Sequence, residues 1–438
     1  MSSMQVVEKP HSHIELQAVS VGQRMMWLMH HYQGQFGALN CPIIIAFEGE
    51  LDYARLQQAW KTLVNTHEAL HTCFVGRGQQ LRRKVTAEIM TDFVIESLCT
   101  EQHSVDLSSQ VFLDTLRDEL RTPVTIEKQA FRTRLWKLSE NLHVLCINQH
   151  HLVTDALSCS LVSHALGRGY EQKNIAMPEW QYSDFVDWET RHINGEKGQQ
   201  HEQYWKHKLS GLKLPSLPKS RTMTSTDPEQ DTITLYRATL KTNQALERIA
   251  KNCRASSFTV MLSIFYLHLY RLTGQYDLTI SSLLNNRSEP QSQDLVGFVA
   301  NMVLLRSRLH KKDTLKDIIN EVREQVSGAL AHQAFPYQLL PAGIVPADSA
   351  RDIVFQMFAE NTHQIASFET VNASAVNPPN GLSRRFDLDL AMMPSAEGMK
   401  IVMAASDLRF RSRFAKMFLQ GFVELVEQIS DENQEVIR

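Results

Sequence analysis

The stretch that decides the fold reads Asn148-Gln149-His150-His151-Leu152-Val153-Thr154-Asp155-Ala156. An apolar run before it, residues 142–147, predicts a buried strand, and apolar residues at helical spacing over residues 157–170 predict a helix after it. Two histidines therefore end a strand, and Asp155 stands where the helix begins. Metal binding or chance would also explain paired histidines, and a helix cap would explain the aspartate. The strand-to-helix junction favours a functional site.

The composition is that of a large globular protein. The chain has 438 residues, 43% of them hydrophobic, which is enough for a core divided between two lobes. A formal net charge of −3, without a basic stripe interleaved with aromatic residues, argues against a nucleic-acid partner. The start of the chain lacks the apolar core of a signal peptide, and the most apolar stretch, residues 258–270, is too short to span a bilayer. We therefore expect no membrane partner and interpret residues 258–270 as a buried helix.

The cysteines favour a reducing compartment. None belongs to a Cys-x-x-Cys pair, and several lie in apolar context, where a reduced thiol packs as a small hydrophobe. We expect a cytoplasmic protein without a disulfide framework or a zinc site. The six cysteines are Cys41, Cys73, Cys99, Cys146, Cys159 and Cys253.

Helix and strand patterns recur in both halves of the chain. In the second half, strands are predicted at residues 277–284 and 299–309. This mixture predicts an α/β protein of two similar lobes with a cleft between them. We expect an N-terminal lobe at residues 1–175, a linking helix and linker at residues 176–230, and a C-terminal lobe at residues 231–438.

A histidine at a strand end is suited to acyl transfer. The imidazole of His151 could take a proton from an attacking amine or hydroxyl, or hold that nucleophile by a hydrogen bond. No activated nucleophile accompanies it, since Cys159 has no base beside it and is interpreted as packing. Direct attack on a thioester is therefore favoured over a covalent acyl-enzyme. The side chains of the adjacent His150 and His151 diverge, and His-Glu-x-x-His spacing is absent, so we expect no metal.

Asp155 admits two interpretations. As an orienting acid it would hold the imidazole, as in a catalytic triad. As a structural acid it would pair with an arginine, because a buried carboxylate needs such a partner. Arg287, at the end of an apolar strand in the second half, is the candidate. We favour the structural role, because the loop needs an anchor if His151 is to be held in place.

Residues 150–156 resemble the His-His-x-x-x-Asp-Gly signature of the condensation domains of nonribosomal peptide synthetases. That signature is shared with chloramphenicol acetyltransferase, wax-ester synthases and polyketide-associated acyltransferases. Six further matches follow in the family's order. They are residues 20–27 to Ser-x-Ala-Gln-x-Arg-Leu-Trp, residues 66–74 to Arg-His-Glu-x-Leu-Arg-Thr-x-Phe, residues 182–188 to Tyr-x-Asp-Phe-Ala-Val-Trp, residues 296–302 to Ile-Gly-x-Phe-Val-Asn-Thr, residues 332–337 to His-Gln-Asp-x-Pro-Phe, and residues 351–356 to a last motif ending in Phe-Gln.

The resemblance implies a V-shaped pair of chloramphenicol-acetyltransferase-like lobes, with a central tunnel and His151 near its middle. Donor and acceptor would enter on the phosphopantetheine arms of carrier proteins, with no tightly bound cofactor. By the resemblance His151 is the catalytic histidine, Asp155 the structural acid and Arg287 its salt-bridge partner. Asn301 and Gln356 would lie near the tunnel or the lobe junction, although a role in satisfying nearby backbone explains them equally well.

The other members of the signature have lesser roles. His150 belongs to the candidate catalytic set with His151 and Asp155, but we expect it to shape the loop. Ala156 replaces the usual glycine, which strains a position with positive φ but fits a first-turn helical residue, the alternative we expect. Gly22 stands where the family motif has alanine. His71 stands where the family often has arginine and Met302 where it often has threonine, and these two departures bear on substrate shape more than on chemistry.

Amide formation is the leading functional hypothesis. A carrier-bound acyl or peptidyl thioester would be joined to an amine acceptor, either carrier-bound or a small molecule. The chain lacks a nucleotide-binding glycine-rich segment and a phosphopantetheine attachment motif, so substrates must be loaded elsewhere. The protein would then act in trans or be a part of a larger synthetase, and from its polar start and end we expect the free-standing form. Two alternatives stay open. One is an O-acyltransferase or ester-forming condensation enzyme with an alcohol acceptor, and the other is a non-catalytic carrier-docking domain.

Overall fold

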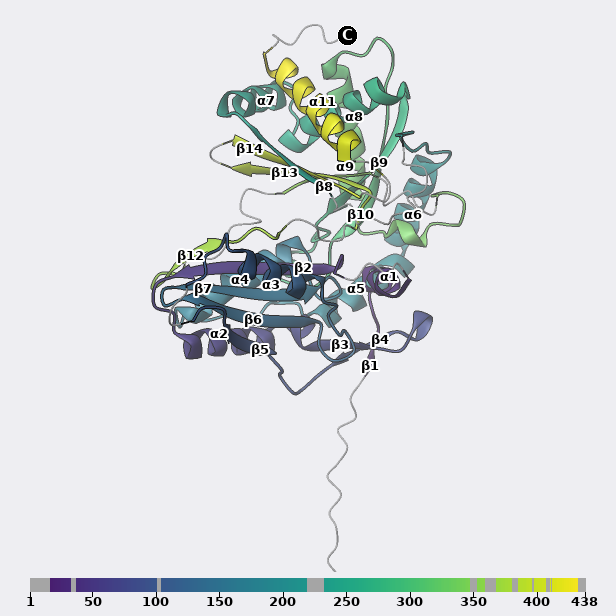
Figure 1. Ribbon diagram of the computed structural model, residues 1–438. Coiled ribbons are helices and arrows are strands. Elements are labelled where there is room, and N and C mark those ends of the chain that lie inside the picture. The colour runs from purple at the N-terminus through teal and green to yellow at the C-terminus, as the bar shows by residue number, and fades with distance from the viewer. Residues whose placement is uncertain are drawn as a thin grey trace, which may run out of the picture.

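Two α/β lobes, one above the other, make up the molecule in Figure 1. This computed structural model describes residues 16–32, 37–100, 104–218, 232–346, 353–358, 368–379, 385–395, 398–406, 410 and 412–431. The helices α5 (Tyr182–Asn194) and α6 (Glu196–Leu209) lead from the lower, N-terminal lobe to the upper, C-terminal one. The part of the second predicted boundary that falls at residues 219–231 lies outside the described residues.

The N-terminal lobe is organised around a five-stranded sheet in the order β12-β2-β7-β6-β5. Successive residues of β2 alternate between two apolar cores, with Ile43 and Ile45 in one and Ile44 in the other. Because both faces of the sheet are buried at its centre, the two central strands β2 and β7 contain nearly continuous apolar runs. The elements of this sheet and its helices are β2 (Asn40–Glu48), α2 (Tyr53–Thr66), β5 (Phe93–Ser97), α3 (Gln110–Arg121), β6 (Phe131–Ser139), β7 (Leu142–His150) and α4 (Ala156–Tyr170).

A small second sheet completes this lobe. Its strands pair in the order β1-β4-β3, all antiparallel. The helix α1 follows its first strand directly and carries the first family-like motif. The elements are β1 (Leu16–Gln17), α1 (Val21–Tyr32), β3 (Thr72–Val75) and β4 (Arg82–Val85).

The C-terminal lobe contains a six-stranded sheet in the order β10-β9-β11-β13-β14-β8. Four helices pack on one face of it around the largest apolar core, and the predicted buried helix is the central one, α8. None of the described helices is both long and apolar enough to cross a membrane. The elements are β8 (Thr232–Ala238), α7 (Leu240–Asn252), α8 (Ser257–Thr273), β9 (Asp277–Leu284), β10 (Asn301–Arg308), α9 (Leu315–Ala331), β11 (Ile353–Met357), β13 (Leu388–Ser395), β14 (Gly398–Ala405) and α11 (Ser412–Asp431).

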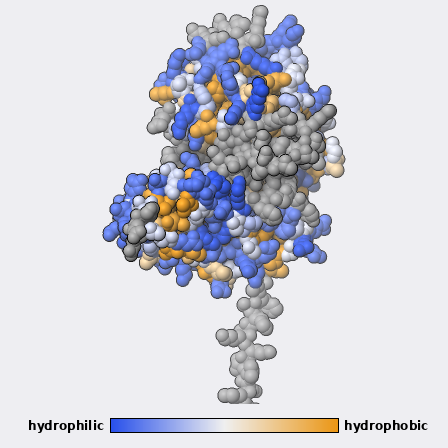
Figure 2. Space-filling model, in the orientation of Figure 1, coloured by the Kyte–Doolittle hydropathy of each residue, from blue (hydrophilic) through white to orange (hydrophobic). Residues whose placement is uncertain are grey.

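One strand from the second half of the chain completes the sheet of the other lobe. β12 (Asn372–Ala375) pairs antiparallel with β2, with Ala373 opposite Phe47. Its sequence Asn-Ala-Ser-Ala contains no β-branched or aromatic residue, which is why no strand was predicted there. The three-part division of the chain stays a prediction. By its residue numbers β12 falls in the predicted C-terminal lobe, but it pairs with a strand of the N-terminal lobe. Hydrophilic residues predominate on the face of both lobes seen in Figure 2, since most apolar side chains lie in the cores.

Candidate active site

The predicted junction between strand and helix is present. β7 ends at His150 and α4 begins at Ala156, so residues 151–155 form the connecting turn. Asp155 caps the helix, and its Oδ1 accepts a hydrogen bond of 2.8 Å from the backbone N–H of Ser158. Ala156 is the first helical residue and does not have a positive φ. Alanine therefore fits this position without strain, which confirms the second of the two alternatives.

The tautomer of His151 follows from its hydrogen bonds. Its Nδ1 lies 3.0 Å from the carbonyl oxygen of Thr154. Because a carbonyl only accepts, Nδ1 carries the proton and Nε2 presents a lone pair. Burial, together with the nearby Arg385 guanidinium, holds the pKa of His151 well below its usual value. The side chain is thus a neutral imidazole at pH 7, the form that can accept a proton or a hydrogen bond.

His150 faces the other way. Its Nδ1 accepts a hydrogen bond of 3.0 Å from the backbone N–H of Leu152, so its Nε2 carries the proton and donates to His30 Nδ1 at 3.1 Å. Burial, reinforced by His30, lowers the pKa of His150 to about 3. The side chains of the two adjacent histidines diverge, as predicted. These contacts fit a residue that shapes the loop.

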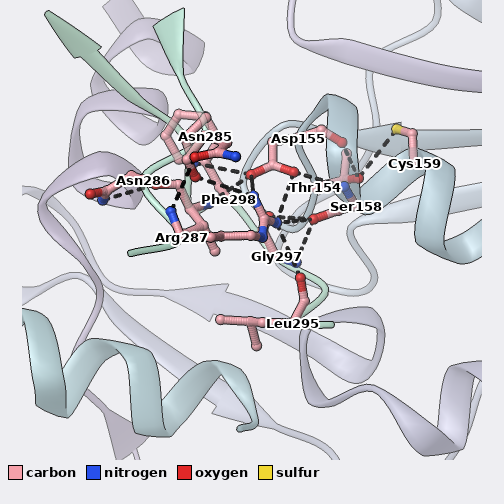
Figure 3. Close-up of polar contacts among 12 residues, drawn as sticks. Thr154, Asp155, Ser158, Cys159, Asn285, Asn286, Arg287, Leu295, Gly297 and Phe298 are labelled. Carbon is pink, nitrogen blue, oxygen red and sulfur yellow. Dashed lines mark hydrogen bonds and ion pairs between the residues drawn. The ribbon is translucent and has the colours of Figure 1, made fainter. Parts of the chain in front are cut away.

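Asp155 and Arg287 form a buried ion pair across the lobes (Figure 3). The contacts are bidentate, 3.0 Å from Nη1 to Oδ2 and 3.1 Å from Nη2 to Oδ1, and the side chains of Arg287 and Asp155 are 0% and 3% exposed. Burial alone would raise the pKa of Asp155, but the charge and hydrogen bonds of Arg287 and the hydrogen bonds of Ser158 hold it below its usual value. The predicted salt bridge is therefore present.

The loop before β10 strengthens this connection. The backbone N–H groups of Val299 and Ala300 donate to Asp155 Oδ2 at 3.1 and 3.0 Å. The carboxylate thus bonds to groups of the C-terminal lobe, while Nδ1 of His151 bonds to the carbonyl of Thr154. Asp155 does not orient the imidazole directly, so this geometry fits the structural acid and not the triad acid.

Two residues beside His151 were missed from the sequence. Nη1 of Arg385 lies 2.5 Å from Nε2 of His151, although 234 positions separate the two residues. The ring of Phe298 packs edge-on against the imidazole, with centroids 5.7 Å apart and planes at 78°. Arg385 lies outside every motif, and Phe298 occupies a position that its motif leaves open. The sequence alone therefore gave no reason to place Arg385 or Phe298 beside His151.

The other predicted site residues lie farther from this chemistry. Asn301 donates to the backbone oxygens of Gln333 and Phe335, at 2.7 and 3.3 Å, so it satisfies nearby backbone. Gln356 donates to Asp389 Oδ1 at 2.7 Å, within the C-terminal lobe. Burial raises the pKa of Cys159 to about 12, which disfavours a thiolate and fits packing.

A two-lobed α/β fold with a histidine at the end of a strand, held at the lobe junction, defines a class of acyltransferases. Within that class the chain belongs to the family described as Condensation domain, whose sequence model matches residues 14–438. It is 27% identical over 427 residues to surfactin synthase subunit 1 of Bacillus subtilis (strain 168), covering 96% of this chain and 12% of that protein. It is 25% identical to tyrocidine synthase 3 of Brevibacillus parabrevis, covering 94% of this chain and 6% of that one. The chain thus spans a small fraction of the length of these relatives.

Solved structures confirm the fold. The X-domain from teicoplanin biosynthesis matches with a TM-score of 0.82 at 19% identity, over 99% of this chain and 98% of that one. The first condensation domain of the calcium-dependent antibiotic synthetase, in complex with a substrate analogue, matches with a TM-score of 0.78 at 16% identity, over 96% and 98% of the two chains. The predicted α/β fold of two chloramphenicol-acetyltransferase-like lobes is therefore correct. The tunnel that the resemblance implies stays a prediction.

Proposed function

We propose that this protein is a condensation enzyme that joins a carrier-bound acyl or peptidyl thioester to an amine. The observation that carries the proposal is the state of His151, a neutral imidazole whose Nδ1 proton is bound by Thr154 and whose Nε2 lone pair is directed at groups of the opposite lobe. Membership of the Condensation domain family supports the same reaction. The substrates would arrive on phosphopantetheine arms of carrier proteins, without a tightly bound cofactor.

In the proposed reaction the amine nitrogen attacks the thioester carbonyl carbon while His151 Nε2 holds an N–H of that amine. The C–N bond forms, the C–S bond breaks, and the amine proton passes through Nε2 to the departing thiolate. Arg385 occupies the position of the nucleophile, since its N–H already donates to Nε2. The incoming N–H must therefore replace the guanidinium there, while the Asp155–Arg287 pair keeps the turn in place.

An ester-forming reaction uses the same groups. An alcohol O–H can donate to Nε2 as an amine N–H does, so the geometry at His151 suits both nucleophiles. A non-catalytic docking role is disfavoured, because Thr154 holds the Nδ1 proton of His151 and so leaves Nε2 as the nitrogen that can accept a proton once the substrate replaces Arg385. The acceptor therefore has to be found by experiment.

The test is to incubate the protein with an acyl-loaded carrier and a panel of amines, alcohols and carrier-bound amino acids, and to follow the acyl group by mass spectrometry. We expect amide products and a loss of about 10²–10⁴-fold in rate for His151→Ala, the usual contribution of a proton-transfer group. His164→Ala is the matched control, because this exposed histidine lies on α4, which begins at the same turn. Products with alcohols alone would reject amide formation, and an unchanged rate for His151→Ala would reject the site.

A further inference from the structure

Gly22, in the first turn of α1, lies against the ring of Phe298 from the other lobe. Its φ is not positive, so the backbone conformation does not require glycine. A Cβ at this position would lie 2.8 Å from Cε1 and 3.0 Å from Cδ1 of the Phe298 ring, which is closer than packed carbon atoms approach. The absence of a side chain at residue 22 thus makes room for this ring. The family motifs that residues 20–27 and 296–302 resemble have alanine at the first position and leave the second open.

The backbone of Phe298 is fixed, so its ring is the part that can move. The carbonyl oxygen of Phe298 accepts a hydrogen bond of 2.7 Å from the hydroxyl of Tyr182. On either side, Gly297 O accepts from Ser158 Oγ at 2.8 Å and Val299 N–H donates to Asp155 at 3.1 Å. A methyl group added at residue 22 therefore displaces the ring rather than the loop, and the ring also contacts His151.

We propose that Gly22 and Phe298 form a coupled specificity pair beside His151. Phe298 acts as an apolar wall that limits the size of the substituent on the carbon next to the reacting group. Gly22 has no side chain and so leaves room for the ring in its observed position. Such a substituent occurs on both reactants, as an α-branch of the acyl donor or as the side chain of an amino-acid acceptor. The inference rests on the proposed condensation reaction, because it assigns the wall to the substrates of His151.

The kinetic test compares four proteins: wild type, Gly22→Ala, Phe298→Ala and the double variant. One arm varies the donor, with a carrier bearing a straight or an α-branched acyl group, and the other varies the acceptor, with glycine amide or valine amide. We expect Phe298→Ala to raise kcat/KM for the branched member of one series about tenfold relative to the unbranched one, the usual effect of a methylene-sized change in an apolar pocket. Gly22→Ala, which displaces the ring of Phe298, should lower kcat/KM about tenfold. The double variant, which has no such ring, should regain the lost kcat/KM.

The arm that responds identifies the reactant facing Phe298. Leu28→Ala, at an exposed position of the same helix, is the control and should behave as wild type. Unchanged selectivity in both series for Phe298→Ala, or a double variant as slow as Gly22→Ala, would overturn the proposal. If the alanine variant does not fold, Phe298→Val takes its place.

A thermal unfolding cycle on the same proteins tests the contact without any activity. Alanine favours a helix over glycine, so a local effect alone would raise Tm. We expect Gly22→Ala to lower Tm in the wild-type background and to raise it in the Phe298→Ala background. A rise in both backgrounds would overturn the coupled pair even in an active enzyme. Wild-type protein without product in any assay would instead overturn the proposed function, and with it the specificity role, while the cycle still reports on the contact.

Discussion

Among the polar contacts between the halves of the chain, two junctions differ in charge, one charged and one neutral. At the first, Asp155 and Arg287 meet as a bidentate ion pair that is almost fully buried. At the second, the imidazoles of His201, on α6, and His332, at the end of α9, meet through their Nδ1 atoms at 2.7 Å. Burial, together with His332, lowers the pKa of His201 to about 4, and burial lowers the pKa of His332 as well.

The surroundings of the histidine junction suit neutral rings. Tyr204 stacks on His332 at a centroid distance of 3.8 Å, and His192 stacks on His201 at 5.2 Å. Since one Nδ1 must donate and the other accept, the pair exists with both rings neutral but not with both doubly protonated. The charged junction therefore depends on the presence of both partners, whereas the histidine junction depends on pH.

The largest effect is expected from removing one partner of the charged junction. Arg287→Ala leaves the carboxylate of Asp155 buried without its cation, which typically costs about 3–5 kcal/mol in the free energy of unfolding. Urea denaturation followed by circular dichroism measures this change. Lys241→Ala, which removes an exposed ion pair with Asp431, is the control and should leave the stability nearly unchanged. A loss below about 1 kcal/mol for Arg287→Ala would show that the lobes do not depend on this pair.

A smaller effect is expected at the histidine junction on acidification. A histidine whose folded pKa lies below its unfolded value of about 6.5 destabilises the fold as pH falls from about 6.5 toward the folded pKa, because the unfolded state then binds more protons. For His201, with a folded pKa of about 4, we expect about 1 kcal/mol between pH 7 and pH 5 after allowance for its partial exposure to solvent.

The contribution of His201 is isolated by comparing variants. His201→Gln should lose less stability than wild type between pH 7 and pH 5, since glutamine keeps a polar group but does not titrate. Other buried histidines destabilise both proteins equally and cancel in the difference. His207→Gln, an exposed position on the same helix, should follow wild type. Equal pH dependence of wild type and His201→Gln would contradict the assignment of acid sensitivity to this junction.

Most of the first junction could be predicted from the sequence, and the second could not. Local patterns predicted the strand, the turn and the helix around His151. The need of a buried carboxylate for a cation, together with the family resemblance, pointed to Arg287 as the partner of Asp155. His332 was recognised only as part of a motif, and His201 has no motif at all. Their contact depends on how α6 crosses between the lobes, which no local pattern encodes.

The N-terminal boundary of β10 also depends on a tertiary contact that local sequence patterns do not reveal. The apolar pattern predicted a strand at residues 299–309, but β10 begins at Asn301. The amides of Val299 and Ala300 bond to Asp155 instead of to a neighbouring strand. A tertiary contact thus overrides the β propensity of these residues. Arg385 was missed for a related reason, since its partner lies in the other lobe and its own neighbours carry no periodic pattern.

The smallest effect on stability is expected from substitution of Arg385. This third link between the lobes joins a cation to a neutral imidazole, so it combines the features of the two junctions. Arg385→Gln keeps an N–H donor for His151 Nε2 but removes the positive charge that, after burial, contributes most to lowering the pKa of His151. The pKa should therefore rise, while burial still holds it below its usual value. Little change in unfolding free energy is expected.

The readout is the pH dependence of kcat/KM, which reports the pKa of the free enzyme's essential base. Since the proposed reaction needs neutral His151, its rate falls as pH drops through this pKa, and a higher pKa moves the acidic limb of the profile to higher pH. Arg385→Lys keeps the charge and should leave the limb nearer to the wild-type position, which separates charge from shape. An acidic limb at the same pH in wild type and Arg385→Gln would show that Arg385 does not act on His151 through its charge, and its contact would then be a matter of packing alone.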